Sequence, residues 1–454
     1  MPSADLALEH VTVLDVLDGE RRRDLTILVE GTRIVAVAPS SRAEVPAGTR
    51  AVDGSGWYVI PGLWDAHVHS AWNTAWHFPL LVAHGITGVR NMHTSVDTAL
   101  ELTRAVARRV ASGELLGPRF LANGPIVDGD PSVQDGSVTA RTPAEGRAIV
   151  DSLARAGADF IKVYSNLSRE VYLAIAAQAR LRGIPLDGHV PFQVRSAEAA
   201  AAGQRTSEHL FGLQMGCSRV ADSLRAEHAR LMAPGTPLPP EQVEDVFFGL
   251  IHAASATRNA DTCAETIQAY RRHGVAVVPT LAALAAFSDP AAVLADTARM
   301  RLVPEEVRRQ WGRLAKAGVF EGTTGTGARV AALENLRLLH AAGVRILAGT
   351  DLGNPFLVPG ASLHDELLLL AEAGLSPLEA LQAATVEPAR VLGLGDSVGR
   401  VAVGMLADLV LLEADPLDDL RHTRRIIGVV VNGRYLDRRE LDELVQPPLV
   451  DSER

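Results

Sequence analysis

The rest of the chain is arranged around one short stretch, Trp57-Tyr-Val-Ile-Pro-Gly-Leu-Trp-Asp-Ala-His-Val-His-Ser70. Its apolar run, 58–63, is interrupted only by Pro61-Gly62 and leads into a His-x-His pair, His67 and His69. Because successive side chains of a β-strand point to opposite faces, the two imidazoles share one face. Neutral imidazole is the commonest protein ligand for zinc and similar ions. The stretch predicts a strand that ends in two metal ligands, although a chain with 14 histidines can contain such a pair by coincidence.

The composition limits the class of protein and of partner. The chain has 454 residues, 47% of them apolar, which suits a large barrel with an accessory domain. A net charge of −10 and a pI near 5.8 argue against a nucleic-acid partner or an anionic membrane surface, so we expect a small-molecule substrate. Residues 1–15 lack the pattern of a signal peptide, and no apolar run approaches the roughly 20 residues that span a bilayer.

The chain contains two cysteines, Cys217 and Cys263, and neither has a cysteine or histidine neighbour at zinc-finger spacing. A disulfide framework is therefore not expected, and the sequence is typical of a reducing compartment. We expect a cytoplasmic protein. The sequence does not fix the oligomeric state, and a homo-oligomer is compatible with it.

Short β-rich runs separated by turn residues occur at both ends of the chain. Within 6–52 these runs alternate with turns such as Asp18-Gly19. Two apolar runs near the other end, 408–412 and 426–431, have the same pattern, and Asn432-Gly433 predicts a two-residue hairpin turn. We expect residues 1–60 and 400–454 to fold together as a small discontinuous β-sandwich domain.

Between these ends, strand-like runs alternate with helical stretches rich in Ala, Leu and Arg. Eight parallel strands close a barrel, so residues 61–399 predict an α/β fold, a (β/α)8 TIM-like barrel longer than the typical ~250 residues. The excess lies in helical insertions near 215–269 and 282–325, which we expect to cover the catalytic end. The candidate strands are 63–69, 85–92, 119–124, 159–164, 184–190, 205–210, 275–281 and 344–351.

In such a barrel, active sites form where strands end and the following loops begin. These positions in strands one, four, five, six and eight hold residues that are metal ligands or can become ligands. A buried ammonium is costly unless it is neutralised or paired, and a lysine with a lowered pKa can react with carbon dioxide to give an anionic carbamate that bridges two metals. The six residues are His67, His69, Lys162, His189, His209 and Asp351.

Each of these residues also has a purely structural alternative. Lys162 can extend to the rim of the barrel or pair with a carboxylate such as Asp159. The histidines of strands five and six can be core residues that bond to the backbone, and Asp351 can cap a helix. The ordered occurrence of all six at strand ends is hard to obtain by accident, so the pattern as a whole predicts a metal site.

The chain resembles the amidohydrolase superfamily, and within it the branch of imidazolonepropionase-like proteins and Xaa-Pro dipeptidases. The resemblance extends over nearly the whole chain. It is carried by Val59-Ile-Pro-Gly-Leu-Trp-Asp-Ala-His-Val-His69, by Gly349-Thr-Asp351, and by the run from Leu378 to Ala389 that leads to Gly404-Met-Leu-Ala-Asp-Leu-Val410. The first two motifs carry chemistry and the others are structural.

The resemblance implies two divalent ions, expected to be Zn²⁺. By that resemblance, His67, His69 and Asp351 hold one ion, two further histidines hold the second, and a carbamylated Lys162 bridges them. Asp351 would also be the catalytic acid and base. The further histidines are His189 and His209. The sequence departs from the pattern of the related peptidases at Pro191, where a second histidine is usual, and at Asn91, where an aspartate is usual.

The sequence thus predicts a binuclear metal-dependent hydrolase. It would cleave an amide or peptide-like C–N bond, as in an N-acyl amino acid or a dipeptide, by attack of hydroxide held by the two ions. Lactone, ester or phosphotriester hydrolysis on the same site and mononuclear deamination are the alternatives, and the intact ligand set argues against a scaffold without metals. The candidate substrate contacts are Tyr164, His93, His364 and Arg90, and candidates for an apolar wall are Trp72, Trp76, Phe192 and Phe211.

Overall fold

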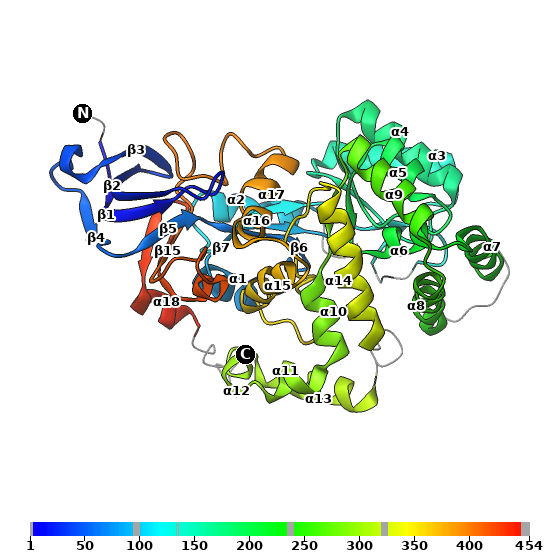
Figure 1. Cartoon of the computed structure of the whole chain (residues 1–454). Coiled ribbons are helices and arrows are strands. Elements are labelled where there is room, and N and C mark those ends of the chain that lie inside the picture. Colours follow the sequence, from blue (N-terminus) through cyan, green and yellow to red (C-terminus); the bar gives the residue numbers. More distant parts are fainter. Residues whose placement is uncertain are drawn as a thin grey trace, which may run out of the picture.

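The structure is a computed structural model that describes residues 3–93, 100–132, 134, 136–233, 240–318 and 326–445. A β domain lies at one end of the molecule, and a larger body of parallel strands and helices makes up the rest (Figure 1). Segments from both ends of the chain meet in the β domain, where the first strands lie beside the last ones. Among the described helices, none combines the length and apolarity needed to cross a membrane.

The β domain is built on one eight-stranded mixed sheet, in the order β17-β16-β15-β5-β1-β2-β3, with β4 paired to β1. Hydrogen bonds join its strands into a single sheet, whereas the sandwich expected from the sequence has two. β5 pairs antiparallel with β15 and parallel with β1, so it joins the two chain ends. The strands are β1 Leu6–Leu14, β2 Arg21–Glu30, β3 Arg33–Pro39, β4 Arg50–Asp53, β5 Tyr58–Pro61, β15 Leu409–Leu412, β16 Ile426–Val431 and β17 Arg434–Asp437.

The predicted turn at Asn432-Gly433 connects β16 to β17. Both residues have positive φ, 52° and 78°, which is the conformation of a tight hairpin that matches the twist of its strands. The sheet curls so far that this turn packs on the turn before β3: a Cβ added to Gly433 would lie 1.9 Å from the carbonyl oxygen of Gly31. Glycine is therefore required there by both conformation and space.

β15 explains why a continuous apolar run can form a strand. Its side chains alternate between two cores, because successive residues of a strand point to opposite faces. Leu409 and Leu411 enter the core of the β domain, whereas Val410 and Leu412 enter the core of the larger body. The two parts of the molecule are therefore joined by a sheet that is buried on both faces.

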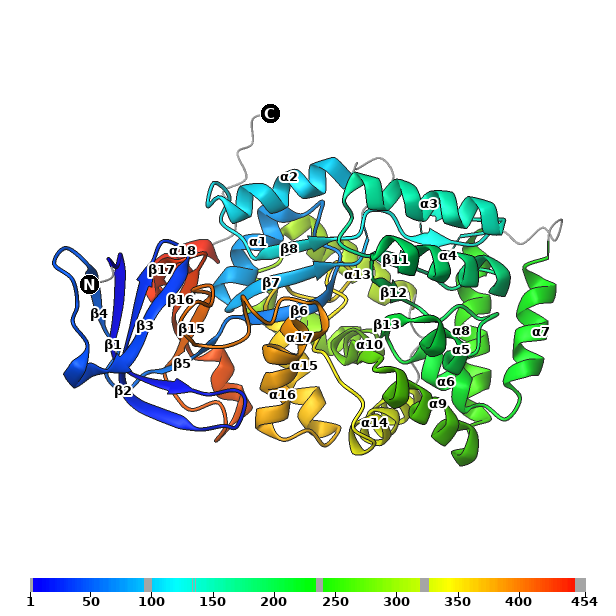
Figure 2. The same ribbon diagram turned by 90° about the horizontal axis from the view of Figure 1, so that it is seen from above.

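The larger body contains two parallel sheets, in the orders β6-β7-β8 and β10-β9-β11-β12-β13-β14. Figure 2 shows these strands between α2, α3 and α4 on one side and α14, α15 and α16 on the other. Seven of the strands correspond to those predicted, and the short β9 and β10 were not predicted. Their bounds are β6 Leu63–Val68, β7 Ile86–Asn91, β8 Arg119–Ala122, β9 Val127–Asp128, β10 Val138–Thr139, β11 Ile161–Val163, β12 Leu186–Gly188, β13 Gln204–Glu208 and β14 Ala276–Val278.

The eighth predicted strand, 344–351, forms only isolated pairings, but it lies between the two sheets. The Leu347 N–H donates to the Val277 carbonyl at 2.9 Å, and the Ala66 N–H donates to the Ala348 carbonyl at 2.9 Å. On the opposite side, the Asp159 N–H donates to the Ala122 carbonyl at 2.9 Å, which brings the segment before β11 next to β8. These contacts follow the strand order of a TIM-like barrel.

Helices follow most of the parallel strands. α4 is typical: the Ser168 side chain accepts a hydrogen bond from the Val171 N–H at its start, and Gly183 ends it in the left-handed conformation. The helices are α1 Thr74–Ala83, α2 Leu100–Ala111, α3 Pro143–Ala156, α4 Arg169–Arg182, α5 Ser196–Ala202, α6 Phe211–Cys217, α7 Ala221–Leu231, α8 Pro240–Ala256, α9 Ala260–His273, α10 Leu281–Ser288, α11 Pro290–Ala295, α12 Thr297–Met300, α13 Glu305–Ala317, α14 Thr326–Ala341, α15 Ala361–Glu372, α16 Pro377–Ala383, α17 Val386–Val391 and α18 Arg438–Leu444, with 3-10 turns at η1 Ser40–Arg42 and η2 Leu420–Arg424.

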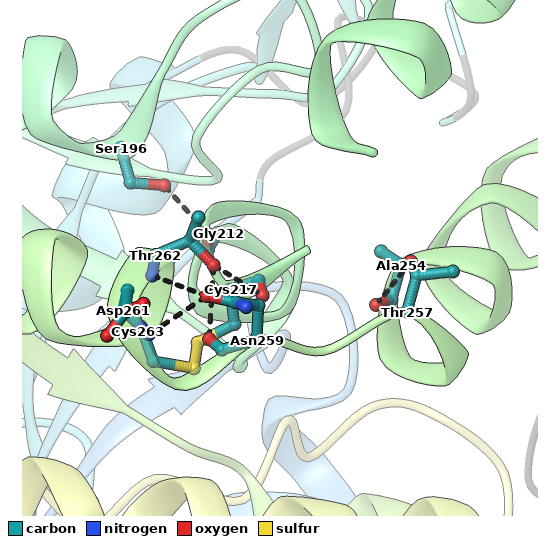
Figure 3. Close-up of a disulfide and its surroundings, with 9 residues drawn as sticks. All are labelled: Ser196, Gly212, Cys217, Ala254, Thr257, Asn259, Asp261, Thr262 and Cys263. Carbon is teal, nitrogen blue, oxygen red and sulfur yellow. Dashed lines mark hydrogen bonds between the residues drawn. A yellow bond between two sulfur atoms is a disulfide. The ribbon is translucent and has the colours of Figure 1, made fainter. Parts of the chain in front are cut away.

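Contrary to the expectation from the sequence, the two cysteines form a disulfide. Cys217 at the end of α6 is bonded to Cys263 in α9, 46 residues away (Figure 3). The carbonyl of Cys217 also accepts hydrogen bonds from the Asn259 N–H at 2.8 Å and from Thr262 Oγ1 at 2.7 Å. Sequence spacing could not reveal this bond, because α7 and α8 separate the cysteines along the chain and the return of α9 brings them together.

Candidate metal centre

All six predicted ligands line one cavity of about 620 Å³. It lies where the parallel strands end, because five of these residues stand within one position of the last residue of a strand and Asp351 ends the eighth segment. β6 supplies the His-x-His pair, β11 the lysine, β12 and β13 one histidine each, and the 344–352 segment the aspartate. Residues from the two predicted helical insertions also line the cavity, mainly from α8 and α10.

Asp351 is the centre of the ligand cluster. Its Oδ1 lies 2.9 Å from Nε2 of His69 and 3.2 Å from Nε2 of His67. One ligand atom each from His67, His209 and Asp351 lies within 4.8 Å of the others. Imidazole nitrogens and a carboxylate oxygen at such separations can converge on one divalent ion. The structure therefore brings together residues from β6, from the end of β13 and from the eighth segment. This trio differs from the grouping that the resemblance implies, which places His209 with His189 rather than with His67 and Asp351.

Three of the predicted ligands, His67, His189 and His209, are hydrogen-bonded through Nδ1, so Nε2 is the ring nitrogen that can bind a metal. Burial lowers the pKa of His209 to about 3 and that of His189 well below its usual value, so both imidazoles are neutral. Within the described residues, the buried Nε2 of His189 has no hydrogen-bond partner. Partners at Nδ1 orient a metal-binding imidazole and fix its tautomer. The pairs are His67 with Glu208 at 2.8 Å, His189 with Ser165 at 2.8 Å and His209 with Thr280 at 2.6 Å.

Lys162 is a buried lysine whose amine forms no direct ion pair within the described residues. Its exposed fraction is 1%, and burial lowers its pKa to about 8, although the Glu208 and Asp351 carboxylates raise it. Among the described residues, its Nζ makes no hydrogen bond or ion pair. Asp159, the alternative partner considered from the sequence, accepts a hydrogen bond from the Ala122 N–H at 2.8 Å instead. A lysine in this state is partly neutral near pH 7–8.

The backbone at the site adopts unfavourable conformations. His209, Thr280 and Asp351 have φ values of 58°, 50° and 64°, in the left-handed region that non-glycine residues rarely occupy. Such a conformation costs roughly 1–3 kcal/mol per residue and persists only where the surroundings impose it. Gly353, with φ 118°, approaches so closely that a Cβ would lie 2.6 Å from Cβ of His69. Two of these strained residues are predicted ligands and Thr280 is hydrogen-bonded to one of them, and strain of this kind is common at functional sites.

Comparison with known proteins decides the family. The family model described as the amidohydrolase family matches residues 58–436. The chain belongs to the amidohydrolase family. It is therefore an amidohydrolase, a hydrolase that acts on carbon–nitrogen bonds. The motifs that suggested this resemblance lie within or directly beside the matched region.

Relatives of known name agree with the assignment. The imidazolonepropionase of Rubrobacter xylanophilus is 30% identical over 416 residues, which cover 86% of this chain and 84% of that protein. Among solved structures, the putative prolidase from Bifidobacterium longum is 26% identical, with a TM-score of 0.67 and coverage of 98% and 99% of the two chains. Bottromycin amidohydrolase is 25% identical, with a TM-score of 0.71 and coverage of 98% and 89%.

Arg90 of the amidohydrolase does not line the cavity, contrary to its predicted role as a substrate contact. Its guanidinium is completely buried and donates to both oxygens of Glu208 and to Asp187, at 2.9 Å in each case. Burial alone would raise the pKa of Glu208, but Arg90 and His67 lower it below its usual value. Arg90 therefore keeps ionised the carboxylate that orients His67.

The other predicted substrate contacts divide into two groups. Tyr164 and His93 line the cavity, and the Tyr164 ring stacks on His189 at a centroid distance of 4.0 Å. His364 lies elsewhere: it is buried between α15 and η2, where Nδ1 bonds to Thr423 Oγ1 at 2.9 Å and Nε2 donates to the His84 carbonyl at 3.0 Å. Its place after the eighth segment suggested a contact, but α15 turns this face away from the cavity.

The sequence analysis missed the residues that support the ligands. Asp65 accepts hydrogen bonds from the Thr350 N–H at 3.0 Å, from Thr350 Oγ1 at 2.6 Å and from the His67 N–H at 3.2 Å. Burial raises the pKa of Asp65 to about 6. This carboxylate ties β6 to the segment that carries Asp351. The sequence did contain a signal for Asp65: it stands two residues before His67, and residues two apart in a strand share a face.

Proposed function

We propose that the amidohydrolase is a binuclear metal-dependent enzyme that cleaves an amide or peptide-like C–N bond. The observation that carries the proposal is the combination at one cavity of neutral, oriented imidazoles, a carboxylate and a buried lysine that forms no direct ion pair within the described residues. We propose that His67, His69 and Asp351 hold one divalent ion, expected to be Zn²⁺, and that His189 and His209 hold the second.

The role of Lys162 as a bridging ligand is supported by its residue type as well as by its position. The chain has 44 lysines and arginines, of which only Lys162 and Lys316 are lysines. An arginine cannot lose its proton in a protein, whereas a buried lysine can. A neutral Nζ can attack carbon dioxide, form an N–C bond and release a proton, which leaves an anionic carbamate with two oxygen ligands.

The residues of the chain then divide the work of hydrolysis. Ions bound here would supply Lewis acidity and lower the pKa of a coordinated water. Asp351 accepts the proton that the attacking water loses and delivers it to the departing nitrogen, so the products are a carboxylic acid and an amine. Burial raises the pKa of Asp351, but the adjacent His67 and His69 outweigh it and hold this pKa well below its usual value, so the carboxylate starts ionised.

Metal analysis of the purified enzyme and of two lysine variants tests this proposal. We expect close to two zinc ions per chain, zinc-dependent release of amine from simple amides, and loss of both in Lys162→Ala. Lys316→Ala is the matched control, because Lys316 is exposed on α13. One ion per chain that does not depend on Lys162 would favour a mononuclear deaminase. Cleavage of esters, lactones or phosphotriesters but not of amides would favour the second alternative.

A further inference from the structure

One wall of the cavity is aromatic. Phe247, Phe248 and Ile251 of α8 line it, at positions that helical periodicity places on one face. Phe211 of α6 completes the wall. Its ring centroid lies 4.9 Å from that of Phe247, which in turn lies 5.0 Å from that of Phe248, and both pairs are edge-to-face. The helix that carries most of this wall belongs to the insertion between β13 and β14.

The aromatic wall directly adjoins two of the proposed metal ligands. The Phe211 ring centroid lies 5.0 Å from that of His209 and 5.7 Å from that of His189. Leu284 and Phe287 of α10 line the same cavity. A substrate group that packs against this wall would therefore lie next to the scissile carbonyl, which is expected to react close to these histidines.

Beside the wall, the described lining residues offer an anionic group histidines such as His252 but no arginine. Among the described lining residues, Lys162 is the only lysine or arginine. Arg90, the arginine predicted from the sequence to contact the substrate, forms ion pairs with Asp187 and Glu208 instead. The internal segments outside the described residues, 94–99, 133, 135, 234–239 and 319–325, contain neither lysine nor arginine in their sequence.

One polar group lies beside the aromatic wall. Gln214 lines the cavity three residues after Phe211, and its buried Oε1 has no hydrogen-bond partner within the described residues. Burying an amide oxygen without a hydrogen-bond partner costs free energy, and a bound N–H group that donates to the oxygen would remove this cost. The cavity therefore combines an apolar wall with a free amide, which suits an uncharged molecule that itself contains an amide.

From these features we infer that the wall formed by Phe211, Phe247, Phe248 and Ile251 is a subsite for a large uncharged, preferably aromatic, group of an amide substrate. The inference rests on the proposed function and narrows its substrate class: amides with a carboxylate at the end of this group should be the poorer substrates. Water adds across the C–N bond, with its oxygen going to the carbonyl carbon and a proton to the nitrogen, and the aromatic group stays on one of the two products.

Three amides of equal size test the inference. The uncharged probe is N-(phenylacetyl)-2-phenylethylamine, which has a phenyl ring on each side of the amide. The two charged probes carry a carboxylate at the para position of one ring or of the other. We expect kcat/KM of the zinc-loaded enzyme to fall at least about tenfold for one charged probe, because an ionised carboxylate is poorly accommodated by an apolar wall. Equal values for all three probes would overturn the inference.

The wall itself is tested by Phe247→Ala and Leu250→Ala. Both residues lie on α8 in the same buried cluster, but Leu250 does not line the cavity. We expect Phe247→Ala to reduce the preference for the uncharged probe at least about threefold, and Leu250→Ala to retain it. Thermal melting shows whether each variant is folded. If Phe247→Ala does not fold, Phe247→Leu replaces it, since leucine keeps apolar volume but removes the ring.

A binding measurement separates failure of this inference from failure of the proposed function. If the zinc-loaded enzyme cleaves none of the probes, calorimetry compares the Kd values of the same three compounds, and the proposed function is judged separately by the metal analysis and by cleavage of simple amides. Binding of the uncharged probe at least about tenfold tighter than one charged probe would still support the subsite. Equal Kd values, or no binding of the uncharged probe, would overturn it.

Discussion

The carboxylate of Glu208 lies 2.8 Å from Nδ1 of His67, although the two residues are 141 positions apart. Because an ionised carboxylate only accepts hydrogen bonds, Nδ1 of His67 carries a proton, and Nε2 is the nitrogen on the side of Asp351. Arg90 holds the other side of this carboxylate. The position of the proton on His67, a predicted metal ligand, is therefore set by two charged residues behind it, Glu208 and Arg90.

Glu208→Gln should weaken zinc binding. The amide keeps the size of the side chain but removes the charge that fixes the His67 tautomer. Loss of such a partner typically costs about 10–100-fold in metal affinity, which a competition assay with a zinc chelator measures. Glu227→Gln, an identical change on the surface of α7, is the control. Unchanged affinity in a folded Glu208→Gln variant would contradict the role of this contact.

Asp351→Asn should lower turnover even in protein that retains zinc. Asparagine can still occupy the site, but it cannot accept and release the proton that a general base transfers. We expect kcat to fall by about 10² to 10⁴, measured with the uncharged amide probe and with the zinc content determined on the same sample. Asp222→Asn, on the exposed face of α7, should keep the parental kcat. Full turnover in zinc-loaded Asp351→Asn would rule out the proton transfer assigned here.

The stability of the protein should depend on pH through Glu366, which lies outside the cavity. Burial raises the pKa of Glu366 to about 8, although the Ala282 N–H donates to its Oε2 at 2.6 Å. The folded state therefore binds a proton that the unfolded state has released, and the free energy of unfolding falls as pH rises from about 4.5 to about 8.

Glu366→Gln removes this proton linkage. In the variant, the free energy of unfolding should not show this decrease, which is on the order of a few kcal/mol. The difference in stability between variant and parent should therefore shift in favour of the variant from pH 5 to pH 8. Urea unfolding at the two pH values, at constant zinc concentration, measures the difference. If parent and variant change in parallel between pH 5 and pH 8, Glu366 is already ionised in the folded protein.

Removal of the disulfide should destabilise the insertion that carries the aromatic wall. The bond closes a loop across 46 residues between α6 and α9, and bonds that close loops of this size typically contribute about 2–4 kcal/mol to the free energy of unfolding. The double variant Cys217→Ser, Cys263→Ser should be less stable by this amount in urea. Dithiothreitol should lower the stability of the parent to that of the variant and leave the variant unchanged. A parent that is insensitive to the reductant would show that the thiols are free.

Local pattern was sufficient for most of the strands and for placing the six predicted ligands at one cavity. The run into His67 and His69 forms β6, and the turn at Asn432-Gly433 has the predicted place, because both depend on side-chain alternation and backbone preference within a few residues. The segment 344–351 was predicted as a strand but forms only isolated pairings. It reaches Asp351 in the left-handed conformation, which a regular strand cannot contain.

The sequence by itself determined the order of strands and helices and which side chains stand at the strand ends, because those features follow from the periodicity of neighbouring residues. Only the tertiary structure decided which groups stand behind the ligands and opposite them. Arg90 pairs with Glu208 rather than with substrate, Cys217 meets Cys263, and Phe247 reaches the cavity from an insertion. These contacts join residues that are far apart in the chain, and packing, not local preference, selects them.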